Sequence, residues 1–298
     1  MQKDLKTAII GIGGVGGYIG AKLTQHKQDV TLFARDKNLD AIKQNGLKII
    51  DNKDEFIVHP KMNEEALFDV VFITSKSYDF KSVCKSIKDY VKDDTLIIPL
   101  ANGVNHKDEL KNYLDKGIIC DGCIYIISNL KEYGVIEKKA DTFYLQFGTE
   151  TKGTEDRLKK LQDILNQSGL KSKYSKTIKY DCWKKYLFIS SFASLTSHFK
   201  KPMGYVVEEQ RELLEAVLLE IQSVANSLNI PISDEDIQKT IKQAQSIPYD
   251  SKTSMQIDFE NEHKTELESL CGYIVKEANR LGVDAKNMEK IYTKLSGV

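Results

Sequence analysis

A glycine-rich turn near the N-terminus is the feature that most constrains how this chain can fold. Residues 8–10 (Ala-Ile-Ile) form a short apolar run typical of a buried parallel strand, and glycines follow at positions 11, 13 and 16 in the G-x-G-x-x-G spacing. In this motif the first glycine permits a tight turn, the second lets a pyrophosphate approach the backbone, and the third lets a helix pack against the strand. A helix over residues 14–26 would point its N-terminal amides at the phosphate. The motif predicts a dinucleotide site, although a glycine-rich turn of another α/β fold has the same spacing. The predicted cofactor-binding residues of this turn are Gly11, Gly13, Gly14, Val15 and Gly16.

The end of the second expected strand, residues 30–34, bears on which dinucleotide is bound. NAD sites usually carry Asp or Glu at this point for the ribose 2′-hydroxyl, whereas NADP sites favour an arginine that receives the 2′-phosphate. Here Arg35 follows Ala34, and we expect Asp36 to cap a helix over residues 39–44. The sequence therefore favours NADP (NADPH), with Arg35 on the 2′-phosphate; the alternative is a solvated arginine at a strand end.

Two further polar side chains follow expected parallel strands. Residues 69–74 and 95–100 are apolar runs, with Lys76 after the first and Asn102 after the second. Ligands of open α/β sheets bind at the carboxyl edge of the strands, so both residues are candidates for contact with the cofactor. Their spacing fits a surface lysine and an ordinary Asn-Gly turn equally well.

The remaining chain predicts two domains. In the first, residues 46–50 and 55–58 are expected to form a hairpin, 134–137 and 142–148 a late antiparallel pair, and 154–168 an amphipathic helix. After about residue 175 the strand-like runs give way to helical periodicity. We therefore expect an α/β domain with a parallel sheet over residues 1–175 and an all-α domain over 176–298, with the active site in the cleft between them. The expected helices of the second domain cover residues 181–199, one long segment through 206–228, a segment after a capping run at 233–236, and 267–281.

Composition excludes several classes of function. Lys+Arg and Asp+Glu both number 43, so the net charge of zero gives no electrostatic case for nucleic acid or an anionic membrane. The apolar runs are too short for a membrane span or a signal peptide, and we expect a cytoplasmic protein. Cys120 and Cys123 form a C-x-x-C without a second pair, which favours two partly buried reduced thiols over a metal or redox site. The five histidines show no ligand spacing, so no metal site is predicted.

The ordered motifs resemble the ketopantoate reductase family (2-dehydropantoate 2-reductases) over essentially the whole chain. The resemblance rests on Gly-Ile-Gly-Gly-Val-Gly-Gly, Phe-Ala-Arg35, Thr-Ser-Lys76, Ala-Asn102-Gly103, Cys-Trp-Lys-Lys185, Ser254-Met255 and Thr-Glu266. It implies an N-terminal Rossmann domain and an all-helical C-terminal domain. It also implies reduction by NADPH of the 2-keto group of ketopantoate to give pantoate, in the biosynthesis of pantothenate and coenzyme A.

The resemblance also implies roles for individual residues. Hydride transfer leaves negative charge on the former carbonyl oxygen, and Lys185 is implied to stabilise it and deliver the proton. Glu266 is implied to hydrogen-bond the substrate hydroxyl, Ser254 to bind its carboxylate, and Lys76 and Asn102 to position the nicotinamide and the carbonyl. The structural alternatives are a snorkelling lysine, a solvated glutamate on a helix face and a plain N-cap serine.

The sequence departs from the family at two positions that are implied to bind the substrate. Family members place asparagines four and eight residues after the catalytic lysine, but Ile189 and Ala193 stand there, with Phe188 and Phe192 close by on the same face. A 2-keto acid more apolar than ketopantoate is therefore the first alternative substrate. A catalytically silent NADPH-binding sensor is the second alternative, against which the retention of Lys185, Ser254 and Glu266 argues. The small-molecule 2-keto acid is the expected partner, and a homodimer is compatible with the sequence.

Overall fold

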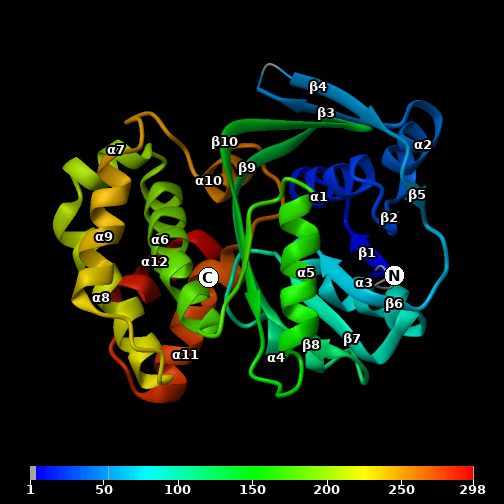
Figure 1. Cartoon of the computed structure of the whole chain (residues 1–298). Coiled ribbons are helices and arrows are strands. Elements are labelled where there is room, and N and C mark those ends of the chain that lie inside the picture. Colours follow the sequence, from blue (N-terminus) through cyan, green and yellow to red (C-terminus); the bar gives the residue numbers. More distant parts are fainter. Residues whose placement is uncertain (1–4, 53, 298) are drawn as a thin grey trace. The chain divides into compact units, whose positions relative to one another are not determined.

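The computed structural model describes residues 5–52 and 54–297, which divide into two compact units (Figure 1). The first unit comprises the chain up to Ala101 together with His106–Ile178. The second comprises Asn102–Asn105 and the chain from Lys179 onward. The short segment at Asn102 therefore belongs to the helical unit, although it lies within the sequence of the α/β unit.

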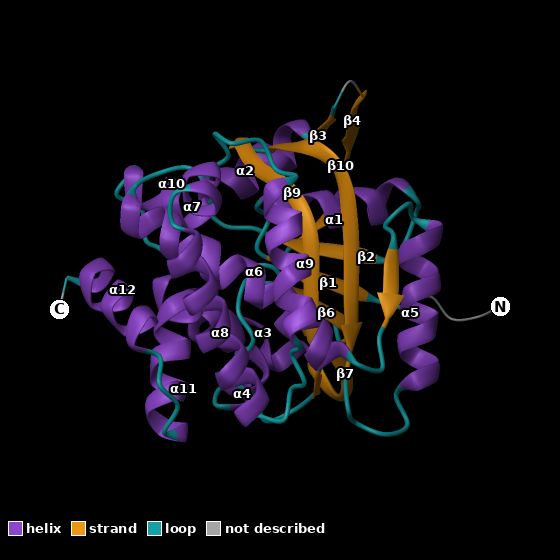
Figure 2. Ribbon diagram, turned by 90° about the vertical axis from the view of Figure 1, so that its left-hand side faces the viewer, coloured by secondary structure: helices purple, strands orange, loops and turns teal. Residues whose placement is uncertain are grey.

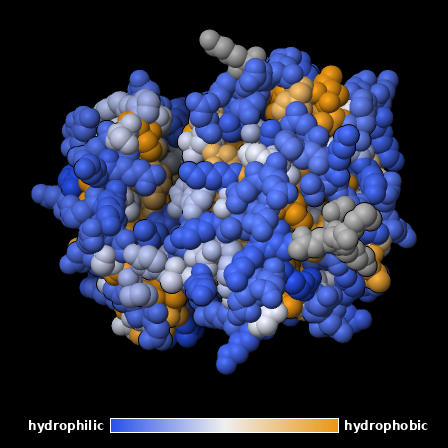
Figure 3. All heavy atoms as spheres, in the orientation of Figure 1, coloured by the Kyte–Doolittle hydropathy of each residue, from blue (hydrophilic) through white to orange (hydrophobic). Residues whose placement is uncertain are grey.

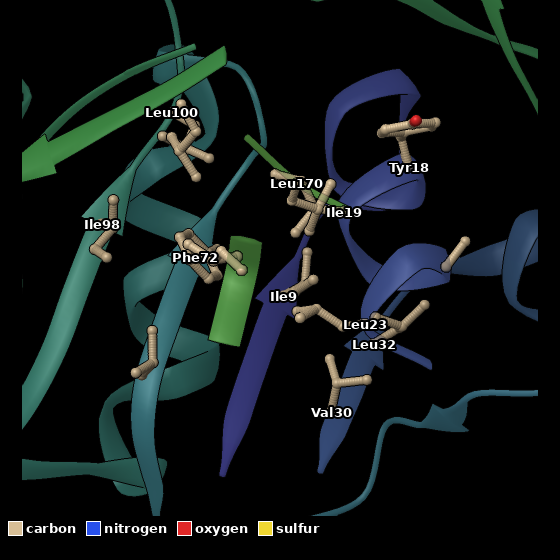
Figure 4. Close-up of a cluster of buried hydrophobic side chains, with 14 of the residues drawn as sticks. Ile9, Tyr18, Ile19, Leu23, Val30, Leu32, Phe72, Ile98, Leu100 and Leu170 are labelled. Atoms are coloured by element: carbon tan, nitrogen blue, oxygen red, sulfur yellow. The ribbon is translucent and has the colours of Figure 1, made fainter. Parts of the chain in front are cut away.

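A six-stranded parallel sheet forms the centre of the first unit. Its strands lie in the order β5-β2-β1-β6-β7-β8, the arrangement of Rossmann domains, in which the chain reverses direction across the sheet between β1 and β6. The central strands β1, β2 and β6 and the second half of β7 are mostly apolar because side chains cover both faces of the sheet. Figure 4 shows one face, where Ile9 and Leu32 lie close to side chains of helix α1 and Phe72 belongs to the same apolar cluster. The strands are β5 (Lys61–Met62), β2 (Val30–Phe33), β1 (Thr7–Ile10), β6 (Phe68–Ile73), β7 (Val91–Pro99) and β8 (Ile118–Ile119).

The described residues of the first unit include five α-helices. Helix α1 contacts strands of both sheets of the unit, and its Ile19 and Leu23 are fully buried between them. Helix α3 covers the opposite face of the parallel sheet through Phe80 and Val83, and short 3₁₀ turns at Ser77–Asp79 and Lys88–Tyr90 flank it. The helices are α1 (Gly14–Gln25), α2 (Asp36–Asn45), α3 (Phe80–Ile87), α4 (His106–Lys111) and α5 (Glu155–Gln167).

A second sheet of five strands completes the unit, and it corrects one expectation. Residues 134–137 and 142–148 are not an antiparallel pair but parts of the single strand β10, which pairs with β9 in a long ribbon (Figure 2). The polar run at residues 138–142 suggests a turn, but the strand continues through it, and the pairing with β9 shifts in register between Lys138 and Phe143. The expected hairpin of β3 and β4 is confirmed. The strands are β11 (Ser172–Tyr174), β10 (Val135–Gly148), β3 (Leu47–Asp51), β4 (Asp54–Val58) and β9 (Asp121–Glu132).

The described residues of the second unit contain helices and loops only. An apolar core that includes Tyr186, Leu218 and Ile274 joins these helices. A π-helical turn, Glu268–Gly272, precedes α11 and is called the π-turn below. The helices are α6 (Ile178–Phe199), α7 (Met203–Glu208), α8 (Arg211–Ser227), α9 (Asp234–Gln245), α10 (Ser254–Glu260), α11 (Tyr273–Leu281) and α12 (Lys286–Ser296).

One expectation for these helices was wrong, and one helix was not expected. The segment expected as one helix through 206–228 is divided into α7 and α8 at Glu209 and Gln210. Both helices bury the same apolar face, so the periodicity continues across the break and does not reveal it. The final helix, α12, was not expected, although Met288 and Ile291 bury its inner face.

The helix caps give one confirmation and two corrections. Ser233 begins α9 in a complete capping box with Asp236, as its sequence predicts. Asp36 does not cap a later helix; it is the first residue of α2, which begins directly after Arg35. Thr253, not Ser254, caps α10 by accepting a hydrogen bond from the N–H of Gln256.

The molecular surface is largely polar. Figure 3 shows charged and polar residues over most of one face, with apolar residues in small patches. Ile57 of β4 is an exposed apolar residue (56% exposed). A search of the described helices finds none with the length and apolar character needed to cross a bilayer.

Candidate active site

The glycine loop after β1 is held from beneath by a threonine at the end of β6. Thr74 donates its hydroxyl toward the carbonyl oxygens of Ile10 (3.0 Å) and Gly11 (2.6 Å). A Cβ at Gly16 would collide with Gly11 O and with Thr74 Oγ1, so this glycine allows α1 to lie against the strand end as the motif predicts. A Cβ at Gly13 would meet no atom within 4 Å. That side of the loop is open, where the motif places a pyrophosphate.

Two contacts that the sequence did not suggest fix the same loop. Asn38 of α2 donates to Ile12 O (2.8 Å) and accepts from the N–H of Gly134 (2.8 Å), so one side chain ties the loop to the β9–β10 turn. Gly14 lies so close to Ser128 O that no Cβ could be accommodated. Helix α1 therefore begins in a fixed place, with no acidic residue in its first turn to compete with an anion for the N-terminal amides.

Arg35 and Lys76 extend from the ends of β2 and β6, as expected. Arg35 is exposed directly after Ala34, whose backbone N–H and C=O both bond to the amide of Asn63 (3.0 and 3.1 Å). Asn63 thus continues the strand pairing by one residue and sets where Arg35 leaves the sheet. Lys76 is half-buried and precedes the 3₁₀ turn. The open glycine loop and this exposed guanidinium are compatible with a phosphorylated dinucleotide.

In the helical unit three of the predicted residues come together. The Lys185 ammonium donates to Asn102 Oδ1 at 3.1 Å, and Asn102 Nδ2 donates to Glu266 Oε2 at 3.4 Å. These residues come from α6, from the loop after β7 and from the segment just before the π-turn. An ammonium can only donate and a carboxylate can only accept, so this orientation of the Asn102 amide is the one that serves both neighbours.

Burial makes this cluster sensitive to charge. Glu266 is only 2% exposed, whereas Lys185 and Asn102 are half-buried. A carboxylate removed from water is costly unless polar partners and a nearby positive charge compensate it. The amide of Asn102 connects Glu266 to the Lys185 ammonium, which supplies that charge. The amide of Asn102 therefore lies between a proton donor, the Lys185 ammonium, and a hydrogen-bond acceptor, the Glu266 carboxylate.

The apolar positions along α6 are less accessible than the sequence suggests. Ala193 is 3% exposed and Phe192 is completely buried in the helical core. Phe188 and Ile189 keep part of their surface exposed, so these two residues lie nearest to solvent in the turn that follows Lys185. The nearby Ser191 hydroxyl points back to Leu187 O in its own helix (2.7 Å) and does not replace an asparagine.

Ser254 is exposed at the first position of α10. Because Thr253 provides the cap, the alternative interpretation of Ser254 as an N-cap does not hold. Thr253 is itself held by Thr196 of α6, with 2.8 Å between the two hydroxyl oxygens. This bond fixes the start of α10 relative to α6, and it was not apparent from the sequence.

The cysteines are consistent with the structural interpretation. All five cysteines are buried, and burial raises the pKa of the Cys120 thiol to about 12. Among residues 5–52 and 54–297, no group of three or more His, Cys, Asp or Glu side chains is arranged to hold a metal ion.

A Rossmann-type domain followed by a helical unit defines a class of proteins. Comparison with known proteins identifies the family. Residues 7–150 match the family model "Ketopantoate reductase PanE/ApbA", and residues 177–298 match its C-terminal counterpart. An uncharacterized oxidoreductase, YkpB of Bacillus subtilis (strain 168), is 32% identical, and the alignment covers 98% of each chain. The chain belongs to the ketopantoate reductase family and is an oxidoreductase of that family.

Two solved structures show the same fold over almost the entire chain. The 2-dehydropantoate 2-reductase of Porphyromonas gingivalis W83 is 26% identical, with a TM-score of 0.85 and coverage of 99% of this chain and 100% of that one. A ternary structure of D-mandelate dehydrogenase with NADH and anilino(oxo)acetate is 22% identical, with a TM-score of 0.89 and 98% coverage of both chains. The expected fold, an α/β domain with a parallel sheet followed by a helical domain, is confirmed.

Proposed function

We propose that this protein is an NADPH-dependent reductase of 2-keto acids, and that family membership makes 2-dehydropantoate (ketopantoate), reduced to pantoate, its first candidate substrate. The observation that carries the proposal is the cluster of Lys185, Asn102 and Glu266, which joins a proton donor to a buried carboxylate in a member of the ketopantoate reductase family. A catalytically silent NADPH-binding protein would have no need to maintain this costly arrangement.

The chemistry follows from the residue types. Bound NADPH supplies a hydride to the carbonyl carbon of the 2-keto acid. Lys185 stabilises the negative charge on the carbonyl oxygen and transfers a proton to it, so that the ketone becomes a hydroxyl group. Asn102 accepts a hydrogen bond from Lys185 and thereby holds the ammonium in one orientation. Glu266 accepts a hydrogen bond from the substrate and orients it, and Ser254 contributes to binding the carboxylate.

We propose that NADPH is bound at the glycine loop of the first unit. The open side of Gly13 and the N-terminal amides of α1 would receive the pyrophosphate. The exposed guanidinium of Arg35 would pair with the 2′-phosphate, and Lys76 and Asn102 would position the nicotinamide. The proposal is supported by the contacts of Thr74 and Asn38 with the carbonyl oxygens of Gly11 and Ile12, which hold the glycine loop in place.

A more apolar 2-keto acid is the second candidate substrate, favoured by Phe188 and Ile189. Both side chains keep exposed surface in the turn after Lys185, and Ile189 stands where the family resemblance implies an asparagine, so neither offers a hydrogen bond to the hydroxyl of ketopantoate. The loss of a neutral hydrogen bond costs about 0.5–1.5 kcal/mol, and more where a polar group of the substrate is left buried and unpaired. An apolar substrate has no hydroxyl to desolvate.

A matched pair of substrates separates the two candidates. Ketopantoate and 3,3-dimethyl-2-oxobutanoate differ by one hydroxyl, and NADPH oxidation measures the turnover of both. We expect the apolar acid to be reduced at least as efficiently as ketopantoate. The KM for ketopantoate should exceed the KM for the apolar acid by up to about tenfold, because one lost hydrogen bond costs about 0.5–1.5 kcal/mol and about 1.4 kcal/mol corresponds to one decade. A clear preference for ketopantoate would make it the substrate and would show that other groups replace the asparagines. No turnover of either acid, with NADPH still bound, would instead favour the sensor interpretation.

The Ile189→Asn variant provides the matched protein control. It restores an amide one helical turn after Lys185, so we expect kcat/KM for ketopantoate to rise about tenfold while that for 3,3-dimethyl-2-oxobutanoate does not rise. An equal change for both substrates would indicate that Ile189 does not face the distinguishing hydroxyl.

A further inference from the structure

Helix α6 presents two buried hydroxyl groups to the π-turn. Tyr186 and Ser190, one helical turn apart, are both completely buried. The Tyr186 hydroxyl lies 2.9 Å from Ser269 O and 3.0 Å from Leu270 O, and Ser190 Oγ donates to Leu270 O at 2.5 Å. The two side chains thus bind consecutive carbonyl oxygens of the same turn.

The π-turn needs such donors because its backbone pairing is irregular. The N–H of Tyr273 bonds to Glu268 O, five residues earlier, whereas an α-helix pairs residues four apart. An extra residue in the turn displaces neighbouring carbonyls from the regular ladder, and a buried carbonyl without a donor is costly. Tyr186 and Ser190 supply donors from outside the turn. Burial raises the pKa of the Tyr186 hydroxyl well above its ordinary value, so the group remains a donor throughout the working pH range.

The same turn determines where Glu266 lies. The carbonyl oxygen of Glu266 accepts hydrogen bonds from Leu270 N at 3.0 Å and from Ser269 Oγ at 3.1 Å. Residues Ser269 and Leu270 are those whose carbonyls bind Tyr186. Because Tyr186 follows Lys185 directly in α6, one network connects the lysine-bearing helix to the backbone of the candidate carboxylate.

We propose that Tyr186 and Ser190 are positioning residues, which hold the π-turn so that the Glu266 carboxylate meets Asn102 beside Lys185. This inference rests on the proposed function, in which Glu266 binds and orients the 2-keto acid. An α-helical turn in place of the π-turn would rotate Glu266 about the helix axis, because one residue fewer would separate it from α11. The hydroxyls of α6 therefore determine substrate recognition without touching the substrate.

The test uses the full-length protein and variants that remove one hydroxyl each. Tyr186→Phe and Ser190→Ala keep the volume of the core nearly unchanged. We expect each to lower kcat/KM for the 2-keto acid about tenfold, chiefly through KM, with the Kd for NADPH unchanged. Ser191→Ala is the matched control for Ser190→Ala, because Ser191 is equally buried but bonds Leu187 O of its own helix. We expect that control to change kcat/KM less than twofold.

A double-mutant cycle separates positioning from general stability. If Tyr186 acts through Glu266, Tyr186→Phe should lower kcat/KM less than twofold in a Glu266→Ala background. A tenfold loss in that background as well, or an equal loss from Ser191→Ala, would overturn the proposal.

Amide hydrogen exchange tests the network independently of the proposed activity. In the Tyr186→Phe/Ser190→Ala variant we expect residues 266–273 to exchange at least tenfold faster while α8 is unaffected. Unchanged exchange in that segment would overturn the positioning role. If the wild-type protein reduces no 2-keto acid, the proposed function fails, whereas faster exchange would still support the network.

Discussion

The candidate sites of the two units are built in different ways. The glycine loop of the first unit acts through its backbone, and Gly11, Gly13 and Gly16 allow its close packing and open side because they lack side chains. The cluster of Asn102, Lys185 and Glu266 in the second unit acts through its side chains, each of which contributes a charged or polar group. The loop spans six consecutive positions, whereas 83 residues separate Asn102 from Lys185 and 164 separate it from Glu266.

This difference determines how each part can be disrupted. A backbone site depends on close packing and tolerates changes in nearby charges, because its donors are amides that every residue carries. A side-chain site depends on a few particular atoms, so that removal of one group disables the chemistry and leaves the fold intact. Changes in the first unit should therefore affect cofactor binding, and changes in the second should affect turnover.

The largest expected effect is at Lys185. If this residue is the general acid, Lys185→Ala should lower kcat by about 10²–10⁴-fold while the Kd for NADPH stays close to that of the wild type. Steady-state kinetics and a fluorescence titration with NADPH measure the two quantities. The neighbouring Lys184, whose ammonium lies 3.9 Å from Asp236, provides the control, and Lys184→Ala should change kcat less than threefold. A Lys185→Ala enzyme with most of its turnover intact would remove the lysine from the mechanism.

The sequence predicted the loop better than the side-chain cluster, for a physical reason. The glycine spacing encodes a local backbone shape, and Thr74, which supports the loop, already ends an apolar run. Contacts between distant residues leave no such local pattern. Spacing alone left Asn102 open between an ordinary turn residue and a cofactor contact, and the resemblance to a family, rather than periodicity, suggested Lys185 and Glu266.

The same limit explains the missed residues. Asn38 positions the glycine loop and Asn63 positions Arg35, each through side-chain hydrogen bonds to backbone atoms. The sequence of a helix or loop does not indicate which of its polar residues make such bonds. The extra residue of the π-turn is likewise hidden, because Leu267, Leu270 and Ile274 keep an apolar spacing compatible with a regular helix.

The second expected effect is at Arg35, a side chain that adds a charged contact to the backbone site of the first unit. The guanidinium should pair with the 2′-phosphate through charge-assisted hydrogen bonds worth about 1.5–3 kcal/mol each. Arg35→Ala should weaken NADPH binding tenfold or more and leave NADH binding and kcat almost unchanged. Lys37→Ala removes an exposed charge two residues away and should affect both cofactors by less than threefold. Equal losses for NADPH and NADH in Arg35→Ala would contradict the assignment.

The smallest expected effect concerns stability rather than catalysis, and it arises from how α6 is anchored. Asp236, 4% exposed, accepts hydrogen bonds from Tyr180 of α6 (3.0 Å to each oxygen) and from the N–H and hydroxyl of Ser233 (2.9 and 2.8 Å). Burial alone would raise the pKa of this carboxyl, but the bonds from Ser233 and Tyr180 and the charge of Lys184 lower it below its ordinary value. The charged form is thus bound more favourably in the folded protein than in the unfolded chain.

The sign of the pH dependence follows from that lowered pKa. The stabilisation is present above the ordinary aspartate pKa of about 3.9 and is lost as the pH falls through the lower pKa of the folded state. Asp236→Asn keeps an oxygen acceptor but loses the charge, so it should lower the free energy of unfolding by about 1–2 kcal/mol at pH 7. Urea titrations between pH 7 and pH 3 should show this difference narrowing below about pH 4. Asp284→Asn, at an exposed ion pair with Lys286, is the control and should have little effect at any pH, because water screens that charge. A difference that stayed constant down to pH 3 would mean that the charge of Asp236 does not anchor α6, and that packing alone holds the lysine-bearing helix.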